Sequence, residues 1–419
     1  VPVHLDHGRR ERLGAANLSM AAQALRVIAI ASKTVPHGTT AIQDADLESG
    51  LTVLGLVGMM DPPRHGVRQA VLRAKAAGIR VMMLTGDQKA TAVAVGREIG
   101  LLGADQEHAD VFTEHEAAAM DDAAFARAVG HAVIFARVSP ETKLRIVSAL
   151  QAAGRTVVMT GDGVNDAPAL KKASAGVAMG ITGTDVSKDV ADMVLTDDDF
   201  TSIVNAVEEG RTVFRNVQQT TGYLFMTNVG EALTLITAIA IGLPLPLLPA
   251  QVLWMNLVTD GLPDMALAAE PGDAEVLDAP PRASHAPILS REIMLLSVIT
   301  SALMCAGTLG LFVWAQRRGG VAYARTVAFT VMAMFQLWNV FNMRSLRRSL
   351  FSVNLGSNPY VLAAIGAAIT LQMAVLYVPG LRIIFGTVPL GLLEWCGIIA
   401  ISSTVFFAVE GWKWMRGQE

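Results

Sequence analysis

The residues best suited to chemistry in this sequence lie in one ten-residue run, Met159-Thr-Gly-Asp-Gly-Val-Asn-Asp-Ala-Pro168. Asp162, Asn165 and Asp166 place several hard oxygen atoms within one tight turn, and Mg²⁺ in proteins prefers such ligands. The glycines between them allow the backbone to approach a ligand closely. A plain turn rich in Asp and Asn is the alternative for a shorter match. Over ten residues the pattern favours a magnesium site that holds phosphate oxygens.

A second turn, formed by Thr85, Gly86 and Asp87, follows the apolar run Ile79–Leu84. Thr85 and the neighbouring backbone N–H groups are suited to hold a phosphoryl group ahead of a helix from Ala90. Alone, Thr-Gly-Asp is a common turn and helix cap. The phosphate-site interpretation is favoured because both turns are expected at the carboxyl edge of a parallel sheet, where such folds bind ligands.

Lys143 lies at the expected start of a helix, after the segment Phe135-Ala-Arg-Val-Ser-Pro-Glu-Thr142. A cation at that end opposes the helix dipole, so it needs an anionic partner. A phosphate group would serve. A solvated surface lysine is the alternative interpretation.

Two carboxylates interrupt a long apolar stretch. Between Tyr223 and Pro263 the only charged residues are Glu231 and Asp260. Both lie ten or eleven residues from the Pro-rich turn that starts at Gly242. At about 1.5 Å per residue they are about 15 Å from that turn, near the middle of a bilayer. A charge at that depth costs about 3 kcal/mol or more, so it indicates function.

Amides and a hydroxyl share helix faces with these carboxylates, at i,i+3 or i,i+4 spacing. Such a set of oxygen atoms suits a hard cation. The sequence therefore predicts a cation site formed by Asn228, Glu231, Asn256, Thr259 and Asp260. Gln336 lies on one face of a later apolar run, where it is expected to be peripheral to the site, or simply to pack between helices.

The elements that must position these residues are of two kinds. Residues 1 to about 215 alternate short apolar runs with helical segments, which predicts a doubly wound parallel sheet. The expected strands are Leu51–Met59, Ile79–Leu84, Ala132–Ala136, Thr156–Met159, Gly176–Met179 and Met193–Leu195. The expected helices between them are Gly66–Ala77, Ala90–Leu101 and Glu141–Ala152.

The second half predicts membrane helices. Six apolar stretches are long enough to cross a hydrocarbon core of about 30 Å: about 221–242, 250–271, 293–316, 326–343, 360–380 and 385–408. An even number places both ends of this half on one side. Five cations favour the cytoplasm for that side: Arg344, Arg347, Arg348, Lys413 and Arg416. Three cations lie on the opposite side and weaken this argument: Arg317, Arg318 and Arg325.

Composition excludes several classes of protein. The 419 residues are 52% hydrophobic and 17% charged, whereas soluble proteins carry about 25% charged residues. The net charge of −4 and the lack of a basic stripe predict no nucleic-acid partner. Cys305 and Cys396 both lie in apolar runs, so they form neither a disulfide framework nor a CxxC metal site.

Taken together, the motifs resemble those of P-type cation-transporting ATPases. The phosphorylation domain is matched by Asp61-Pro-Pro-Arg64, Thr85-Gly-Asp87, the Lys143 segment and Thr160-Gly-Asp-Gly-Val-Asn-Asp166, in the same order and spacing. The ion-binding helices of calcium pumps are matched by Asn228-Val-Gly-Glu231 and Trp254-Met-Asn-Leu-Val-Thr-Asp-Gly-Leu-Pro263. The resemblance covers nearly the whole chain.

The resemblance implies a haloacid-dehalogenase-like α/β domain, with a Rossmann-like parallel sheet, followed by an α-helical membrane domain of six transmembrane helices. Residues 1–58 would be the carboxyl-terminal remnant of a nucleotide-binding domain. Residues 59–214 would be the phosphorylation domain with its stalk, and residues 215–419 the transmembrane domain.

The resemblance also implies a role for each matched residue. Asp162 becomes the Mg²⁺ ligand, and Asn165 and Asp166 lie beside it in the phosphate site. Thr85 and Lys143 contact an aspartyl phosphate. Gly86 and Asp87 belong to the same catalytic set. ATP is the implied substrate, and its binding site or the adjoining hinge would contain Arg26, Asp61, Arg64 and Arg137.

One departure from the family is informative. The family phosphorylates the Asp of an Asp-Lys-Thr-Gly-Thr sequence, which does not occur here. We therefore expect this chain to be the carboxyl-terminal part of a pump whose amino-terminal part is its missing partner. Alone, it is expected not to hydrolyse ATP by the P-type route. A naturally truncated, inactive relative is the alternative.

The implied function is ATP-driven cation transport through an aspartyl phosphate. Ca²⁺ is favoured because heavy-metal pumps have two membrane helices after this domain and Cys-rich ion sites. Mn²⁺ and Na⁺ stay open, since all three ions accept oxygen ligands. In reticulum-type calcium pumps a glutamate occupies the position of Gln336, so the neutral amide lowers the negative charge of the site.

A membrane-anchored phosphatase or sensor of the haloacid-dehalogenase type is an alternative of another class. Such a protein has no use for Glu231 and Asp260 at matched depth. The expected location is the lipid bilayer of the plasma membrane, as a multi-pass protein, with the α/β domain and the carboxyl terminus in the cytoplasm.

Overall fold

The computed structural model describes residues 3–23, 25–35, 50–59, 63–103, 110–272, 274–278, 280–283, 286–346, 348–352 and 354–416. The chain divides into two compact units, one of residues 1–207 and 277–284, the other of residues 208–276 and 285–419. Each unit has hydrophobic clusters of its own.

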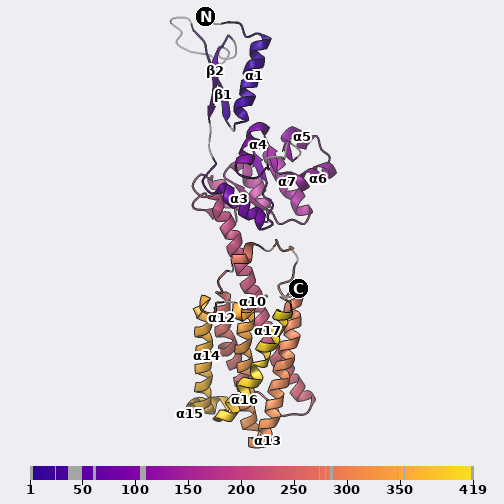
Figure 1. Ribbon diagram of the computed structural model, residues 1–419, viewed down its shortest axis with the longest axis vertical. Coiled ribbons are helices and arrows are strands. Elements are labelled where there is room, and N and C mark those ends of the chain that lie inside the picture. Colours follow the sequence, from indigo (N-terminus) through magenta and orange to yellow (C-terminus); the bar gives the residue numbers. More distant parts are fainter. Residues whose placement is uncertain are drawn as a thin grey trace. The chain divides into compact units, whose positions relative to one another are not determined.

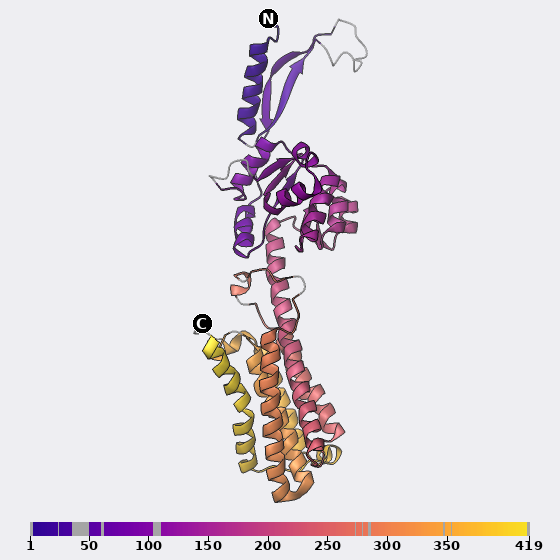
Figure 2. The same cartoon turned by 90° about the vertical axis from the view of Figure 1, so that its right-hand side faces the viewer.

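The first unit begins with a small antiparallel sheet. α1 (His7–Ala21) packs against β1 (Arg26–Ser32) and β2 (Thr52–Met59), as Figures 1 and 2 show. The run Leu51–Met59 forms a strand as predicted, but its predicted place in the parallel sheet is wrong, because β2 pairs antiparallel with β1 and Leu54 is 66% exposed. Gly58 lets α1 approach: a Cβ there would lie 2.8 Å from Met20 Cε.

Two parallel sheets of three strands follow. The first contains β3 (Met83–Thr85), β5 (Ile134–Ala136) and β4 (Val111–Thr113), in that order. The second contains β6 (Val158–Gly161), β7 (Ala175–Met179) and β8 (Met193–Leu195). Among the described residues no ladder joins β3 to β6, so each is an edge strand. Leu84 of β3 nevertheless packs against the apolar cluster that contains Met159 of β6.

Helices between these strands supply the apolar cover. α3 (Val67–Ala76), α4 (Lys89–Glu98) and α7 (Pro140–Ala152) confirm the three predicted helices. The other helices are α5 (Glu114–Ala118), α6 (Asp122–His131), η1 (Val164–Asp166), α8 (Ala167–Lys172) and α9 (Asp185–Val190). β5 is fully buried, as expected for a central strand of a parallel sheet. The predicted α/β fold is therefore confirmed.

The second unit is built from apolar helices (Figure 2). Its long helices are α10 (Phe200–Ala240), which begins in the first unit, α13 (Arg291–Met343) and α14 (Pro359–Tyr377). The shorter elements are α11 (Pro249–Trp254), the π-helical η2 (Met255–Asp260), α12 (Gly261–Ala268), α15 (Pro379–Phe385), α16 (Leu392–Ser402) and α17 (Thr404–Arg416).

Four helices of the described chain are long and apolar enough to cross a membrane: α10, α13, α14 and the segment Leu392–Arg416. α13 has 53 residues, but Gly320 breaks it with a φ of +80°. Its two arms are antiparallel, since Thr308 meets Met332 and a Cβ on Gly307 would meet Phe335. η2 divides the predicted stretch 250–271 into shorter pieces. The count of six stays a prediction.

Buried ion pairs join the helix ends of the second unit. Arg344 Nη2 lies 2.8 Å from Glu270 Oε1, and Asn358 donates to the other oxygen of that carboxylate at 2.8 Å. Lys413 pairs with Glu410 at 2.9 Å. Two of the cations used above to orient the chain are therefore neutralised locally, and the orientation stays a prediction.

Asp198 closes the loop that follows β7. Its carboxylate accepts hydrogen bonds from the backbone N–H groups of Gly180, Ile181 and Thr182 and from the Thr182 hydroxyl, at 2.6 to 3.0 Å. Burial raises the pKa of Asp198, but these hydrogen bonds outweigh it and lower the pKa to about 2. The φ of Asp198 is +51°, so the carboxylate is held in a backbone conformation that few non-glycine residues adopt.

Replacing this carboxylate should loosen the loop in a pH-dependent way. Because the folded pKa of about 2 lies below the ordinary value, the stabilisation is present above about pH 4 and is lost as the pH falls through about 2. In Asp198→Asn, hydrogen exchange at residues 180–182 should be faster than in the wild type at pH 6, and the two proteins should converge near pH 2. Asp197→Asn, which changes the adjacent exposed carboxylate, is the control. Equal exchange in all three proteins at pH 6 would contradict this account.

Candidate functional site

The loops after β3 and β5 are tied together. The Thr85 hydroxyl donates to Asp87 Oδ2 at 3.0 Å and accepts from the Asp87 N–H at 3.1 Å. The backbone N–H of Arg137 donates to the Asp87 carbonyl at 3.1 Å, and that of Val138 donates to the Thr85 carbonyl at 3.2 Å. Arg137 has a φ of +57°. Backbone strain of this kind collects at functional sites.

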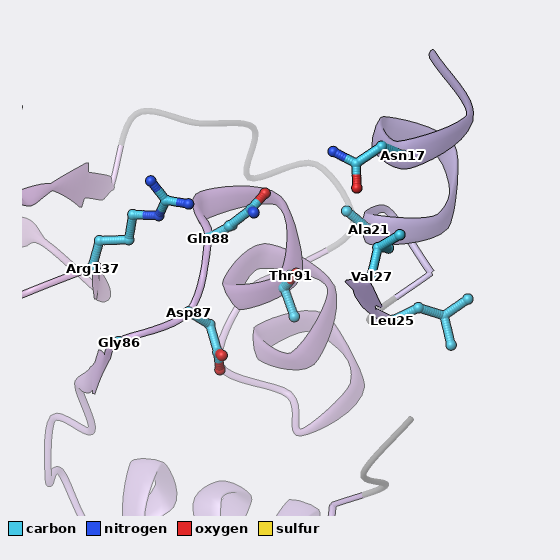
Figure 3. Close-up of a pocket in the computed structure, with 9 residues that line it drawn as sticks. All are labelled: Asn17, Ala21, Leu25, Val27, Gly86, Asp87, Gln88, Thr91 and Arg137. Atoms are coloured by element: carbon cyan, nitrogen blue, oxygen red, sulfur yellow. The ribbon is translucent and has the colours of Figure 1, made fainter. Parts of the chain in front are cut away.

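A pocket of about 310 Å³ lies beside these loops (Figure 3). Figure 3 shows the Arg137 side chain extending toward Gln88 at the start of α4, with Asn17 and Ala21 of α1 on the opposite side. The remaining lining residues are Leu25, Val27, Gly86, Asp87 and Thr91. A guanidinium, a carboxylate and amides beside apolar side chains suit a ligand that has both a charged part and a ring.

The loop after β6 presents Asp162 to solvent. The Asp162 carbonyl accepts from the Thr184 N–H at 2.8 Å and from the Ser187 hydroxyl at 3.2 Å, which fixes the backbone, while the side chain is exposed. Asn165 is exposed as well, and Asp166 is buried. A Cβ on Gly161 would lie 2.5 Å from that of Asp166, so only glycine fits there.

Lys143 and Asp166 form a largely buried ion pair. Lys143 Nζ lies 2.6 Å from Asp166 Oδ1, and the side chains are 15% and 10% exposed. Asp166 Oδ2 also accepts from the Gly163 N–H at 3.2 Å. The anion that this lysine requires is therefore supplied by the chain itself.

The start of α7, which positions Lys143, is fixed by hydrogen bonds. Ser139 caps the helix by accepting from the Thr142 N–H at 3.2 Å, and Pro140 occupies the first turn. Glu114 accepts from both Ser139 and Thr142, at 2.7 to 3.0 Å. Burial raises the pKa of Glu114, but these hydrogen bonds outweigh it and hold the pKa below its ordinary value.

The described residues contain no group of three or more His, Cys, Asp or Glu side chains able to hold a metal. Mg²⁺ usually keeps several waters and is bound through one or two carboxylates together with substrate phosphates. The exposed carboxylate of Asp162 and the amide of Asn165 fit that mode. They fit a magnesium ion that arrives with phosphate, rather than one held by the protein alone.

The remaining residues predicted for the nucleotide site or hinge are scattered. Arg64 donates to the carbonyl oxygen of Asp198. Arg26 is the first residue of β1, and its side chain lies outside the described part of the structure. Asp61 also lies outside the described residues. A nucleotide role for these three residues stays a prediction.

Four of the side chains predicted for the cation site meet inside the second unit. Gln336 Nε2 donates to Glu231 Oε1 at 2.7 Å and lies 3.4 Å from Asp260 Oδ2. Thr259 Oγ1 lies 2.6 Å from Gln336 Oε1. None of the four side chains is more than 4% exposed. Gln336 is therefore central rather than peripheral, because its amide lies between both carboxylates.

Asn228 and Asn256 do not join this cluster. Both are exposed, and the Asn228 amide donates to the Leu224 carbonyl at 2.7 Å. The i,i+3 spacing permits Asn228 and Glu231 to share a helix face, but the Asn228 amide is bound to the backbone of its own helix instead of the cluster. The π-helical winding of Met255–Asp260 changes the faces that α-helical spacing predicts for Asn256.

Tyr223 is a member of the cluster that the sequence did not reveal. It is fully buried, and its hydroxyl lies 2.9 Å from Asp260 Oδ1 and 3.1 Å from the Thr259 carbonyl. A tyrosine at the start of an apolar stretch is usually a membrane-interface residue. Its partner Asp260 is the last residue of the π-helical η2, 37 residues further along the chain.

Comparisons with known proteins agree with this arrangement. The family model for haloacid dehalogenase-like hydrolases matches residues 4–174, and the model for the carboxyl terminus of cation-transporting ATPases matches residues 244–415.

Similar proteins come from bacteria and yeast. A calcium-transporting ATPase of Bacillus subtilis is 41% identical over 394 residues, which are 94% of this chain and 44% of that protein. A probable cation-transporting ATPase F of Mycobacterium tuberculosis is 42% identical over 87% of this chain and 40% of its own length. Calcium-transporting ATPase 1 of Saccharomyces cerevisiae is 39% identical over 95% of this chain and 42% of its own length.

The chain thus spans less than half the length of these relatives, and the matched part runs from the α/β unit into the apolar helices. The resemblance inferred from the motifs is confirmed over both units. Together with the four apolar helices, it identifies a multi-pass membrane protein. The chain belongs to the P-type cation-transporting ATPases and corresponds to their carboxyl-terminal part.

Proposed function

We propose that this chain is the carboxyl-terminal part of an ATP-driven pump that transports Ca²⁺ through an aspartyl-phosphate intermediate. The observation that carries the proposal is the meeting of Glu231, Asp260, Thr259 and Gln336, all buried, within apolar helices. Two carboxylates are costly at such a place unless a cation or hydrogen bonds compensate them. The relatives whose names specify Ca²⁺ support this ion, and Mn²⁺ and Na⁺ are the other ions that oxygen ligands would accept.

The phosphorylation chemistry is assigned to the two loops at the sheet edges. Asp162 would hold Mg²⁺, which neutralises the charge on phosphate oxygens when it is bound. Thr85 would donate to a phosphoryl oxygen, and Lys143 would exchange Asp166 for the phosphate. Arg137 and Asp87 would orient ATP in the adjoining pocket.

The divided sheet supports a missing part of the same pump. β3 and β6 are both edge strands, and their carboxyl ends carry the two loops. Short parallel strands are normally buried within a sheet, yet both are partly exposed. We infer that a strand from outside this chain pairs between them and supplies the phosphorylated aspartate. The proposed setting is the plasma membrane, with the α/β unit and the carboxyl terminus in the cytoplasm.

The role of Asp162 can be tested in the longer protein that contains this chain. Asp162→Ala should reduce Mg²⁺-dependent phosphoenzyme formation from ATP by at least about 100-fold, because the metal loses its fixed carboxylate. The fold should survive, since the side chain is exposed. Acid-stable incorporation of labelled phosphate is the measurement. Asp189→Ala, which removes an exposed carboxylate from α9, is the matched control, and equal labelling of both variants would refute the assignment.

Transport depends on Asp260 in this proposal. Asp260→Asn should abolish Ca²⁺-activated phosphorylation from ATP, because the cation loses half of the carboxylate charge of its site. Phosphorylation from inorganic phosphate in the absence of Ca²⁺ should persist, since that reaction needs no bound cation. Ca²⁺-activation curves decide the matter. Glu394→Gln, at the start of α16, is the control, and an unchanged curve for Asp260→Asn would place the transport site elsewhere.

A further inference from the structure

The amide of Gln336 contacts three other members of the buried cluster, Glu231, Thr259 and Asp260. One N–H points at Glu231 Oε1, at 2.7 Å, and the other faces Asp260 Oδ2, at 3.4 Å. The carbonyl end of the same amide faces the Thr259 hydroxyl, at 2.6 Å. The side chain has no exposed surface, so all its hydrogen bonds must be made within the protein.

This orientation cannot coexist with a cation between the two carboxylates. The amide hydrogens carry positive partial charge and use the same oxygen atoms that a cation would bind. They also lie between two carboxyl groups that repel each other in this poorly solvated place when both are ionised. A carboxylate at position 336 could not donate in this way, because an ionised carboxylate only accepts hydrogen bonds.

The Thr259 hydroxyl makes the reverse orientation available. It lies 2.6 Å from Gln336 Oε1 and 3.0 Å from the Met255 carbonyl, and it has one proton to give. When the hydroxyl donates to the amide oxygen, the N–H end of the amide faces the carboxylates. When it donates to the Met255 carbonyl instead, its lone pairs can accept from the amide nitrogen, and the amide oxygen then faces the carboxylates. In the first orientation the threonine donates its one proton to the amide, and in the second it donates to the Met255 carbonyl and accepts from the amide nitrogen, so it keeps a hydrogen bond to Gln336 in both.

We propose that Gln336 is a reversible amide switch in the transport site. Its N–H end bridges Glu231 and Asp260 when no cation is bound, and its carbonyl end turns toward the cation when one is bound. The proposal rests on the transport function proposed above and assigns to one side chain the stabilisation of both forms. Gln336 is thus a positioning residue for the carboxylates in one form and a cation ligand in the other.

The switch can be tested in the longer protein with Gln336→Met, which has neither end of the amide, and Gln336→Glu, which keeps an oxygen but loses the N–H groups. Phosphorylation from inorganic phosphate in EGTA reports the cation-free form. It should fall about threefold or more in both variants, since hydrogen bonds to charged groups are lost. Ca²⁺ activation of phosphorylation from ATP should weaken about threefold or more in Gln336→Met but not in Gln336→Glu.

Gln372→Met is the matched control. Gln372 is another buried glutamine of the second unit, but its amide oxygen accepts from Trp254 Nε1 at 3.1 Å instead of meeting a carboxylate. This variant should match the wild type in both reactions. Wild-type phosphorylation from inorganic phosphate in both Gln336 variants would eliminate the bridge, and wild-type Ca²⁺ activation of Gln336→Met would eliminate the turn toward the cation. A wild-type protein that forms no phosphoenzyme in either reaction would instead reject the proposed pump.

Discussion

Two carboxylates withdrawn from water inside apolar helices are the constraint on which the second unit depends. Glu231 and Asp260 are tolerated because the Gln336 amide of α13 donates to both carboxylates and the Tyr223 phenol of α10 reaches Asp260. In this arrangement η2 departs from α-helical winding, and Gln336 of the second arm of α13 contacts Glu231 of α10. The apolar surface of the bundle stays outward, as shown by the exposed Leu253, Leu257 and Met265. The helices thus place apolar side chains on the outside of the bundle and enclose the polar cluster within it.

Much of this could be predicted from the sequence. The useful patterns are local in the sequence. They are apolar strands that end in Thr-Gly-Asp, and apolar stretches that contain an isolated Glu or Asp. They located the loops after β3 and β6, and they also identified Glu231, Thr259 and Asp260. The local rules hold because turns and buried strands demand particular residue types wherever they occur.

The rest depends on contacts between distant segments. Gln336 bridges the carboxylates although it lies 76 residues further along the chain than Asp260. The antiparallel pairing of β2 depends on β1, and the π-helical turn of η2 changes which residues share a face. The partner of Lys143 proved to be Asp166, which the same motif analysis had placed only beside a phosphate. Spacing along one segment carries no information about such pairings.

The ion pair between Lys143 and Asp166 also bears on how tightly a phosphate can be held. A lysine that faced water alone would gain strongly from any anion brought to it. In the proposed function a phosphate would displace a carboxylate that already lies 2.6 Å from Lys143 Nζ, so only the difference between two similar attractions would favour binding. The lysine would have one anionic partner before the exchange and one after it. For the proposed aspartyl phosphate, this exchange would therefore contribute little net free energy to either its formation or its release.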